Sequence, residues 1–262
     1  MEKKLLVAVV LVALVATTGF AALQTVSLYN GGALPGGGTY SGTESFWMRS
    51  GDDLGNNGVS LRLGYQTDTG VCRTVIRFDA LSHWAGVDLG FTADKIVGAR
   101  LLIMTRTASE GSGVAELHVL GDSDEEWTES YSKWSLRRRD TVPTQPWAGG
   151  PGAGSNYGPV VDTFAWHPIG GNPMDNWLMT LDIASSALDV VKNWVSGNDT
   201  TDSFMLKAQT ETGTSMNYLN MRSETDGTIG YRPVLQIDYD LTIPEPATMV
   251  ILGLGVLLMR RK

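Results

Sequence analysis

The strongest constraint on the fold is a series of strand-length segments, several of which alternate apolar and polar side chains. In "VCRTVIRFDAL" a period of two separates two faces of a strand. One face carries Cys72, Thr74, Ile76 and Phe78, and the other carries Arg73, Val75 and Arg77. Further segments of this length are "VSLRLGY", "IVGARLLIMTRT", "VAELHVL", "NWLMTLDI", "SFMLKAQT", "NYLNMRSE" and "RPVLQIDYDL". Together they predict about eight or nine short strands.

One segment has helical spacing instead. "SSALDVVKNWVSGN" places Leu188, Val191, Trp194 and Val195 on one side of a helix, and Gly197 stands just past its end. The 31 glycines and 10 prolines favour many turns. We therefore predict an all-β fold, an antiparallel jelly-roll β-sandwich with one short helix.

Both ends of the chain differ from this body. Residues 1–22 have a charged start that contains Lys3 and Lys4, then an apolar run, and they end in small residues. This is the layout of a secretory signal peptide. Residues 23–42 include "NGGALPGGGTY" and are predicted to be a flexible lead-in. The uncharged run 247–259 would reach about 20 Å as a helix, against a hydrocarbon core of about 30 Å. A C-terminal anchor helix is predicted if the basic end snorkels to the headgroups.

The C-terminal residues resemble a known sorting signal. Pro244, Glu245 and Pro246 precede the apolar run, and Arg260 and Arg261 follow it. This order over 242–262 resembles the PEP-CTERM sorting signal of bacterial exported proteins. The resemblance implies a transient membrane anchor, processing by an exosortase-type membrane protease, and a host that makes extracellular polysaccharide. The alternative is an ordinary C-terminal membrane anchor.

The net charge and the cysteine content of the chain limit which partners and which covalent cross-links its central domain can have. The net charge of −8 and the pI near 4.9 argue against nucleic acid as a partner. The single cysteine, Cys72, leaves no internal disulfide framework for an exported domain. Such a domain must rely on its core or on a bound ion.

The body also resembles a family of surface modules. The phrases "RTVIRFDAL", "EEWTESYSKW", "LDVVKNWVSGN" and "RSETDGTIGYRPVLQIDY" occur in an order that is similar to the disaggregatase-related, DNRLRE-type modules. We assign the resemblance to residues 43–241. It implies a non-catalytic jelly-roll sandwich that in some members binds polysaccharide and often serves as a spacer. The opening strand "ESFWM" departs from the family pattern, which weakens any transfer of an ion site.

Aromatic residues in the irregular stretch 136–176 are candidates for sugar binding, because the apolar face of a sugar ring packs on an aromatic ring. These candidates are Trp147, Tyr157 and Trp166. Arg73 and Arg77 could grip uronate carboxylates. The alternatives are that the rings cover the core and that the arginines form salt bridges. Trp127, Trp134 and Trp194 are predicted to be core residues.

Two acidic segments are candidates for metal binding or catalysis. "RSGDDLGNNG" supplies oxygen ligands that suit Ca²⁺, from Asp52, Asp53, Asn56 and Asn57, although a plain turn is the alternative. Glu125 and Glu126 are adjacent, so on a strand they would point to opposite faces rather than act together on a glycosidic bond.

The sequence therefore predicts an exported protein of the cell envelope, surface or extracellular matrix. Its sandwich is expected to be non-catalytic and to bind polysaccharide. Two alternatives stay open. One is a spacer subunit that binds no sugar, and the other is a polysaccharide lyase or hydrolase, which needs an acid, a base and a charge-neutralising group in one groove.

Overall fold

The computed structural model describes residues 23–241, except for 36, 52, 57, 68–69, 80–90, 107–110, 121–126, 128–131, 139–142, 148–151, 153–155, 168–174, 184, 199–202 and 213–215. The predicted signal peptide (1–22) and sorting signal (242–262) lie outside these residues. Within the described part, no helix combines the length and the apolar character needed to cross a membrane.

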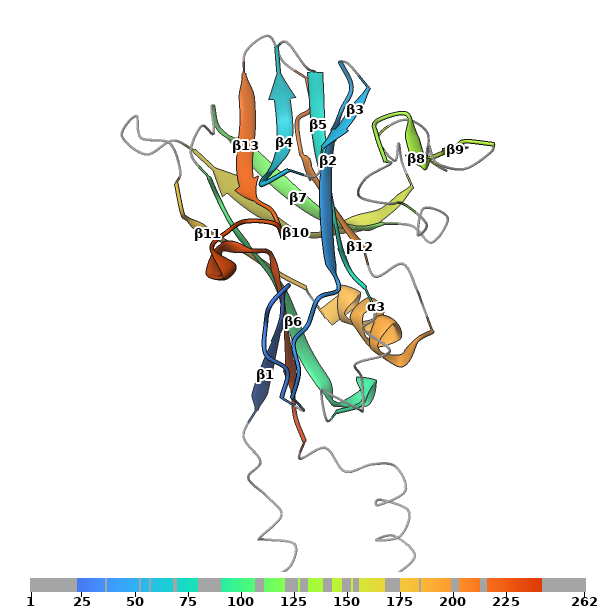
Figure 1. Ribbon diagram of the computed structural model, residues 1–262, viewed down its shortest axis with the longest axis vertical. Coiled ribbons are helices and arrows are strands. Elements are labelled where there is room, and N and C mark those ends of the chain that lie inside the picture. Colours follow the sequence, from blue (N-terminus) through green and yellow to red (C-terminus); the bar gives the residue numbers. More distant parts are fainter. Residues whose placement is uncertain are drawn as a thin grey trace, which may run out of the picture.

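A four-stranded antiparallel sheet forms one layer (Figure 1). In spatial order its strands are β1 (Gln24–Leu28), β14 (Val234–Tyr239), β6 (Ile96–Met104) and β11 (Leu178–Asp182). Buried and more exposed side chains alternate along β14 and β11. This period of two is what a sheet with one covered face requires.

A larger antiparallel sheet forms the second layer. Its main path is β10 (Tyr157–Trp166), β7 (Gly113–Leu120), β12 (Ser203–Ala208), β5 (Gly70–Phe78), β2 (Thr43–Arg49) and β3 (Leu54–Asn56). β4 (Ser60–Gln66) pairs with both β5 and β13 (Asn217–Arg222). A bridge between Thr105 and Met221 joins the layers. β8 (Leu136–Arg138) and β9 (Gln145–Pro146) form a separate pair.

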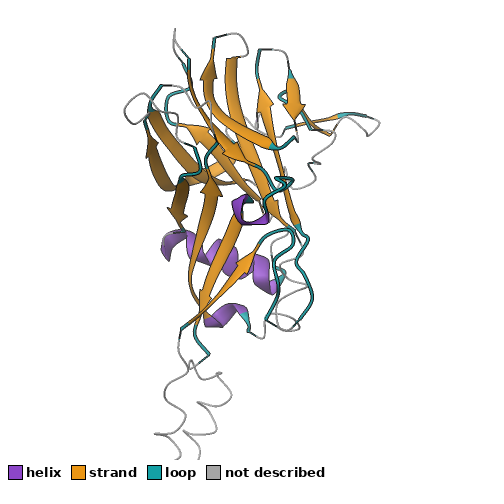
Figure 2. Cartoon of the chain, turned by 60° about the vertical axis from the view of Figure 1, so that its left-hand side comes forward, coloured by secondary structure: helices purple, strands orange, loops and turns teal. Residues whose placement is uncertain are grey.

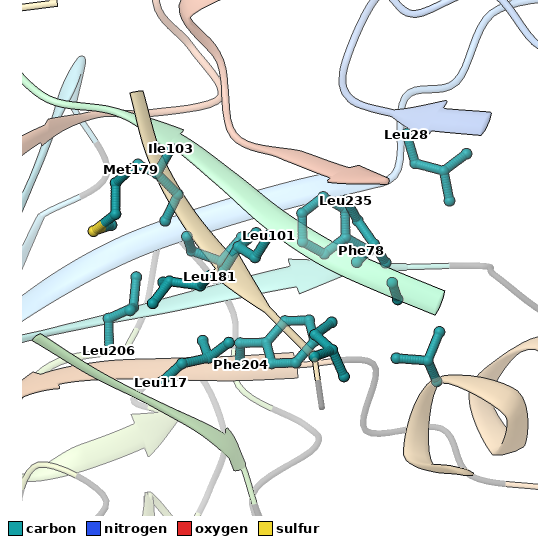
Figure 3. Packing of buried hydrophobic residues seen from close by; sticks show 14 of the residues in the cluster. Leu28, Phe78, Leu101, Ile103, Leu117, Met179, Leu181, Phe204, Leu206 and Leu235 are labelled. Atoms are coloured by element: carbon teal, nitrogen blue, oxygen red, sulfur yellow. The ribbon is translucent and has the colours of Figure 1, made fainter. Parts of the chain in front are cut away.

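The main core lies between the two sheets (Figure 3). Leu101, Leu181 and Leu235 from the small sheet belong to the same buried cluster as Phe78, Leu117, Phe204 and Leu206 from the large sheet. Cys72, Ile76 and Phe78 all lie in this cluster, whereas Val75 packs on the opposite face. The predicted division of β5 into two faces is confirmed.

The predicted helix is present as α3 (Ser185–Ser196), the one α-helix among the described residues (Figure 2). Its Trp194 ring meets Phe204 edge-on at a centroid distance of 4.9 Å. Two short 3₁₀ turns, η1 (Ala93–Lys95) and η4 (Ile229–Tyr231), complete the described helical elements. The mostly β, antiparallel, sandwich-like fold is thus confirmed, and the jelly-roll connectivity stays a prediction.

Residues 23–42 require a correction. They contain β1, and Val26, Leu28, Leu34 and Tyr40 are buried in the main core. The interpretation of this segment as a flexible lead-in is wrong. Val26 and Leu28 alternate along β1, which completes the small sheet, and Leu34 and Tyr40 of the glycine-rich stretch pack into the core.

Candidate functional site

Four of the five predicted sugar-binding residues converge on the outer face of the large sheet, the face turned away from the main core. This face holds a second hydrophobic cluster, and its members are Phe46, Met48, Val75, Leu120, Trp127, Trp147 and Met205, with Trp134 and Tyr157 packed against it. All six residues of β12 are buried, so the central part of the large sheet is covered on both faces. The chain leading through β8 and β9 supplies Trp134 and Trp147 to this cover.

The predicted aromatic candidates are less exposed than expected. Trp147 and Trp166 are each 2% exposed. The Trp147 ring lies parallel to Phe46 at 6.1 Å, and its Nε1 donates to the Lys133 carbonyl at 2.8 Å. Trp166 lies in the main core against Gly113, where an added Cβ would approach the ring to 2.5 Å. The expectation of open rings is wrong for both tryptophans, because the sheet faces they cover would otherwise contact water.

Tyr157, the third aromatic candidate, is half-buried. Its ring lies 4.6 Å from the His118 ring, centroid to centroid. The expectation of core positions holds for Trp127 and Trp194, which are buried, while Trp134 is only partly buried at the edge of the second cluster.

Arg73 and Arg77 share the outer face, as predicted, and both engage protein acceptors. Arg73 forms a bidentate pair with Glu211 through Nε and Nη2 at 2.8 and 2.7 Å, and donates from Nη1 to the Gly152 carbonyl at 2.7 Å. Arg77 pairs with Glu44 and lies 4.6 Å from the centroid of the Trp127 ring. The salt-bridge alternative therefore describes both arginines in this structure.

A cluster of ionisable side chains that the sequence reading did not identify lies on the same face. Lys207 Nζ donates to Glu116 Oε2 at 2.8 Å, and His118 Nε2 is 3.4 Å from the same oxygen. Each of the three residues is less than 10% exposed. Burial alone would raise the pKa of Glu116, but the bond from Lys207 and the contact with His118 outweigh it and hold the pKa below its usual value.

This cluster could have been suspected from charged residues inside otherwise apolar strands. In β7, "VAELHVL" carries Glu116 and His118, and in β12 "SFMLKA" carries Lys207. Which charges meet depends on the pairing of β7 with β12, which places Glu116 opposite Lys207. The groups satisfy one another, so their arrangement suits the stabilisation of a sheet rather than contact with a large polymer.

The predicted calcium residues are only partly described. Asp52 and Asn57 lie outside the described residues, and Asn56 is described only through its place in β3. Asp53 has a positive φ of 52°, which fits the turn alternative. Its carboxylate pairs with Lys133 and accepts from Ser135 N and Oγ at 2.6 and 2.7 Å.

These bonds occupy the Asp53 carboxylate. Burial would raise the pKa of Asp53, but the bonds from Lys133 and Ser135 lower it overall. Within the described ranges, no three His, Cys, Asp or Glu side chains are grouped so that they could hold a metal ion. A calcium site in this segment stays a prediction.

One tryptophan that is not among the predicted sugar-binding candidates is exposed. Trp177 is 46% exposed and precedes Leu178, which is 54% exposed at the start of the edge strand β11. Of the tryptophans in the described ranges, it alone is an exposed residue. The pattern of "NWLMTLDI" predicts a strand, and a strand pattern does not reveal which end is exposed to solvent, so the sequence alone does not identify Trp177.

The backbone that carries Trp177 is held on both sides. Thr105 Oγ1 accepts from Trp177 N at 2.9 Å, and Thr105 N donates to the Trp177 carbonyl at 2.8 Å. Asn176 adopts a positive φ of 58°, and its Oδ1 accepts from Arg222 Nη2 at 2.8 Å. Arg222 also pairs with Asp175 at 3.5 Å. We call Asp175, Asn176, Trp177, Leu178 and Arg222 the Trp177 platform.

The platform combines an exposed aromatic ring with polar side chains. The half-exposed ring of Trp177 offers an apolar face, and the Asn176 amide and the Asp175 carboxylate belong to the neighbouring residues. The Arg222 guanidinium is engaged by Asp226 at 3.0 Å as well as by Asn176 and Asp175. Because the backbone is fixed, little conformational entropy would be lost on binding. The fold and this surface together define an all-β, sandwich-like domain that carries an exposed tryptophan in the Trp177 platform.

Comparison with known proteins assigns the C-terminal end of the chain. Residues 242–262 match the PEP-CTERM protein-sorting motif. Signals of this kind are processed by exosortases, which are membrane proteins, and the motif implies export to the cell envelope or surface. No family match supports the DNRLRE-type resemblance of the body, which stays a prediction. No curated protein matches the chain.

Proposed function

We propose that this chain is an exported surface or matrix protein whose sandwich binds extracellular polysaccharide without catalysing a reaction. The PEP-CTERM match supports the export half of the proposal and an exosortase as a partner. We further propose that the C-terminal apolar run seats in the membrane until the signal is processed.

The observation that carries the binding half is the exposed Trp177, whose backbone is hydrogen-bonded to Thr105. A ring that is 46% exposed still has apolar area to bury, and burying it against a sugar ring is favourable. The Asp175 side chain is 38% exposed and lies 3.5 Å from Arg222, so its carboxylate can also accept from sugar hydroxyls. A neutral or mixed polysaccharide suits this surface, because the platform carries both signs of charge.

The other two functions fit the geometry less well. A lyase or hydrolase needs converging acid, base and neutralising groups that a polymer can reach, whereas Glu116, His118 and Lys207 are buried. A pure spacer would give no role to the adjacent exposed side chains of Trp177 and Leu178.

Affinity electrophoresis of the full chain in gels containing neutral or uronic polysaccharides tests the proposal. We expect retardation by at least one polymer and a loss of affinity of about tenfold in Trp177→Ala, equivalent to about 1.4 kcal/mol. Val160→Ala is the matched control, since Val160 is also 46% exposed but lies on β10 of the other sheet.

Each outcome has a distinct meaning. No retardation by any polymer would support the spacer, and shortening of the polymer would support an enzyme. Equal retardation of the wild-type chain and Trp177→Ala would show that the platform is not the binding surface.

A further inference from the structure

Both ends of the described domain leave it at one pole. β1 and β14 pair antiparallel, with Gln24 opposite Tyr239. The Tyr239 hydroxyl donates to Gln24 Oε1 at 2.7 Å and fastens the two strand ends together. Residue 23, where the described chain begins, and residue 241, where it ends, therefore lie close together beside this pair of strand ends. β1 lies at the lower end of the coloured part of the chain in Figure 1. We call this end the terminal pole.

The terminal pole is rigid beneath its surface. The buried Phe91 ring stacks on Tyr239 with centroids 4.1 Å apart. Asp240 N donates to the Lys95 carbonyl at 2.9 Å, which ties the end of β14 to η1 and the start of β6. A strand end held in this way presents its neighbouring side chains in fixed positions.

The same pole carries exposed apolar side chains from three chain segments. Leu23 before β1 is 61% exposed, Val97 near the start of β6 is 45% exposed, and Leu241 after β14 is 42% exposed. β14 separates β1 from β6, and Tyr239 is paired with both Gln24 and Ile96. The three side chains therefore surround one strand end, and they are three of the nine large apolar side chains that are exposed in the described ranges.

The connection to the sorting signal is short. Pro244 follows Leu241 by three residues, which span at most about 10 Å when fully extended. The apolar run begins at Ala247, six residues after Leu241, or at most about 20 Å away. The headgroup layer on each side of a bilayer is roughly 5–8 Å thick. A C-terminal run seated in the membrane would thus hold the terminal pole within reach of the lipid.

The charge around the pole indicates which lipid it suits. Asp94 has a side chain that is 50% exposed, and the neighbouring Lys95 ammonium is buried and lies 3.5 Å from it. Basic side chains would be needed to attract anionic headgroups. The exposed side chains named here from the described residues of the pole are apolar or acidic, so a zwitterionic lipid surface is favoured.

We propose that the terminal pole is a membrane-contact surface, on which Leu23, Val97 and Leu241 rest in the headgroup region of a zwitterionic lipid surface while the C-terminal run is seated. This inference rests on the membrane seating put forward under the proposed function. In this orientation the terminal pole of the anchored domain faces the lipid. The far end of β6 and the nearby Trp177 platform point away from the lipid.

Lipid-dependent quenching of an environment-sensitive dye tests the contact. Cys72→Ala removes the native cysteine from the full chain, and each of three variants then carries one introduced cysteine for the dye, Val97→Cys, Val59→Cys or Leu254→Cys. Each labelled variant is bound to phosphatidylcholine vesicles that contain brominated lipid. Val59 is the matched control, because it is also an exposed valine, 48% against 45%. The Val59 carbonyl lies 3.4 Å from Nη1 of Arg106, a residue just beyond the far end of β6. At the rise of a β-strand, that end of β6 is roughly 25 Å from Val97.

We expect quenching at position 97 at least twofold stronger than at position 59, together with strong quenching at position 254 in the tail. Quenching at 254 with equal signals at 97 and 59 would overturn the membrane-contact surface and leave the seated tail intact. Absence of quenching at all three positions would overturn the seating itself and the contact with it. Quenching at 97 that occurs only when phosphatidylglycerol is added would overturn the zwitterionic apolar contact.

Discussion

Replacing Glu116 by glutamine removes the carboxylate that neutralises a buried lysine. Lys207 Nζ lies 2.8 Å from Glu116 Oε2, and each side chain is 11% exposed. At an effective dielectric constant of about 20, charges about 3 to 4 Å apart attract by about 4 to 6 kcal/mol. Desolvation offsets much of this attraction, so the intact pair adds little net stability, but breaking one side leaves a buried charge and costs about 3–5 kcal/mol.

We expect Glu116→Gln to lower the free energy of unfolding by about 3 kcal/mol at pH 7, because the amide oxygen can still accept one bond from Lys207. For a domain of this size, that corresponds to a fall in Tm of about 6–12 °C. Urea unfolding followed by tryptophan fluorescence measures the difference directly.

The pH dependence supplies a second readout. The folded-state pKa of Glu116 is lowered, so its contribution is complete above the unfolded-state value of about 4.3 and is lost as the pH falls through the folded value. The stability gap between the wild-type chain and Glu116→Gln should be constant above about pH 5.5 and should shrink below about pH 4.

A surface pair provides the matched control. Lys192 Nζ lies 3.9 Å from Asp189 on α3, and the Asp189 side chain is 82% exposed. Asp189→Asn should change the free energy of unfolding by less than about 0.5 kcal/mol. A loss below about 1 kcal/mol for Glu116→Gln, or a gap that does not vary with pH, would refute the assignment of a buried, charged pair.

Two further substitutions test the fold and its outer cover. Gly64→Ala should lower the free energy of unfolding by about 2–4 kcal/mol in chemical unfolding, because Gly64 has a φ of +107° and a Cβ would lie 2.3 Å from the Asn217 carbonyl oxygen. The control Gly227→Ala should lower it by about 1 kcal/mol or less, because a Cβ there would have nothing within 4 Å. Trp147→Ala should lower the unfolding free energy by about 3–5 kcal/mol yet leave polysaccharide retardation of the folded protein unchanged; a selective loss of binding without loss of stability would restore Trp147 as a binding residue.

The faces of individual strands could be predicted because the pattern is local. Alternation in β5 correctly assigned Ile76 and Phe78 to the main core and Arg73 and Arg77 to the opposite face. The helix at Ser185–Ser196 was equally predictable from its spacing. The sorting motif at 242–262 was recognisable because its order of residues is contiguous in the chain.

The exposure of the aromatic residues could not be predicted in this way. Glycine and proline around Trp147 suggested an open loop, but the ring covers Phe46 on a strand about a hundred residues earlier in the chain. The sequence pattern predicts Trp177 to be part of a strand, whereas the structure places it just before the edge strand β11, where it is exposed. Both outcomes depend on which segment lies over which face.

The sequence alone determined the all-β class, the inward and outward faces of β5, the single α-helix of the described ranges and the sorting motif. These depend on residues close together in the chain. Only the tertiary structure shows that Glu116 pairs with Lys207 and that Leu23 and Leu241 lie at one pole. It also shows that Trp147 is buried and Trp177 is exposed to solvent. The physical reason is that strand pairing joins distant segments, and a period of two specifies a face without specifying the partner that covers it.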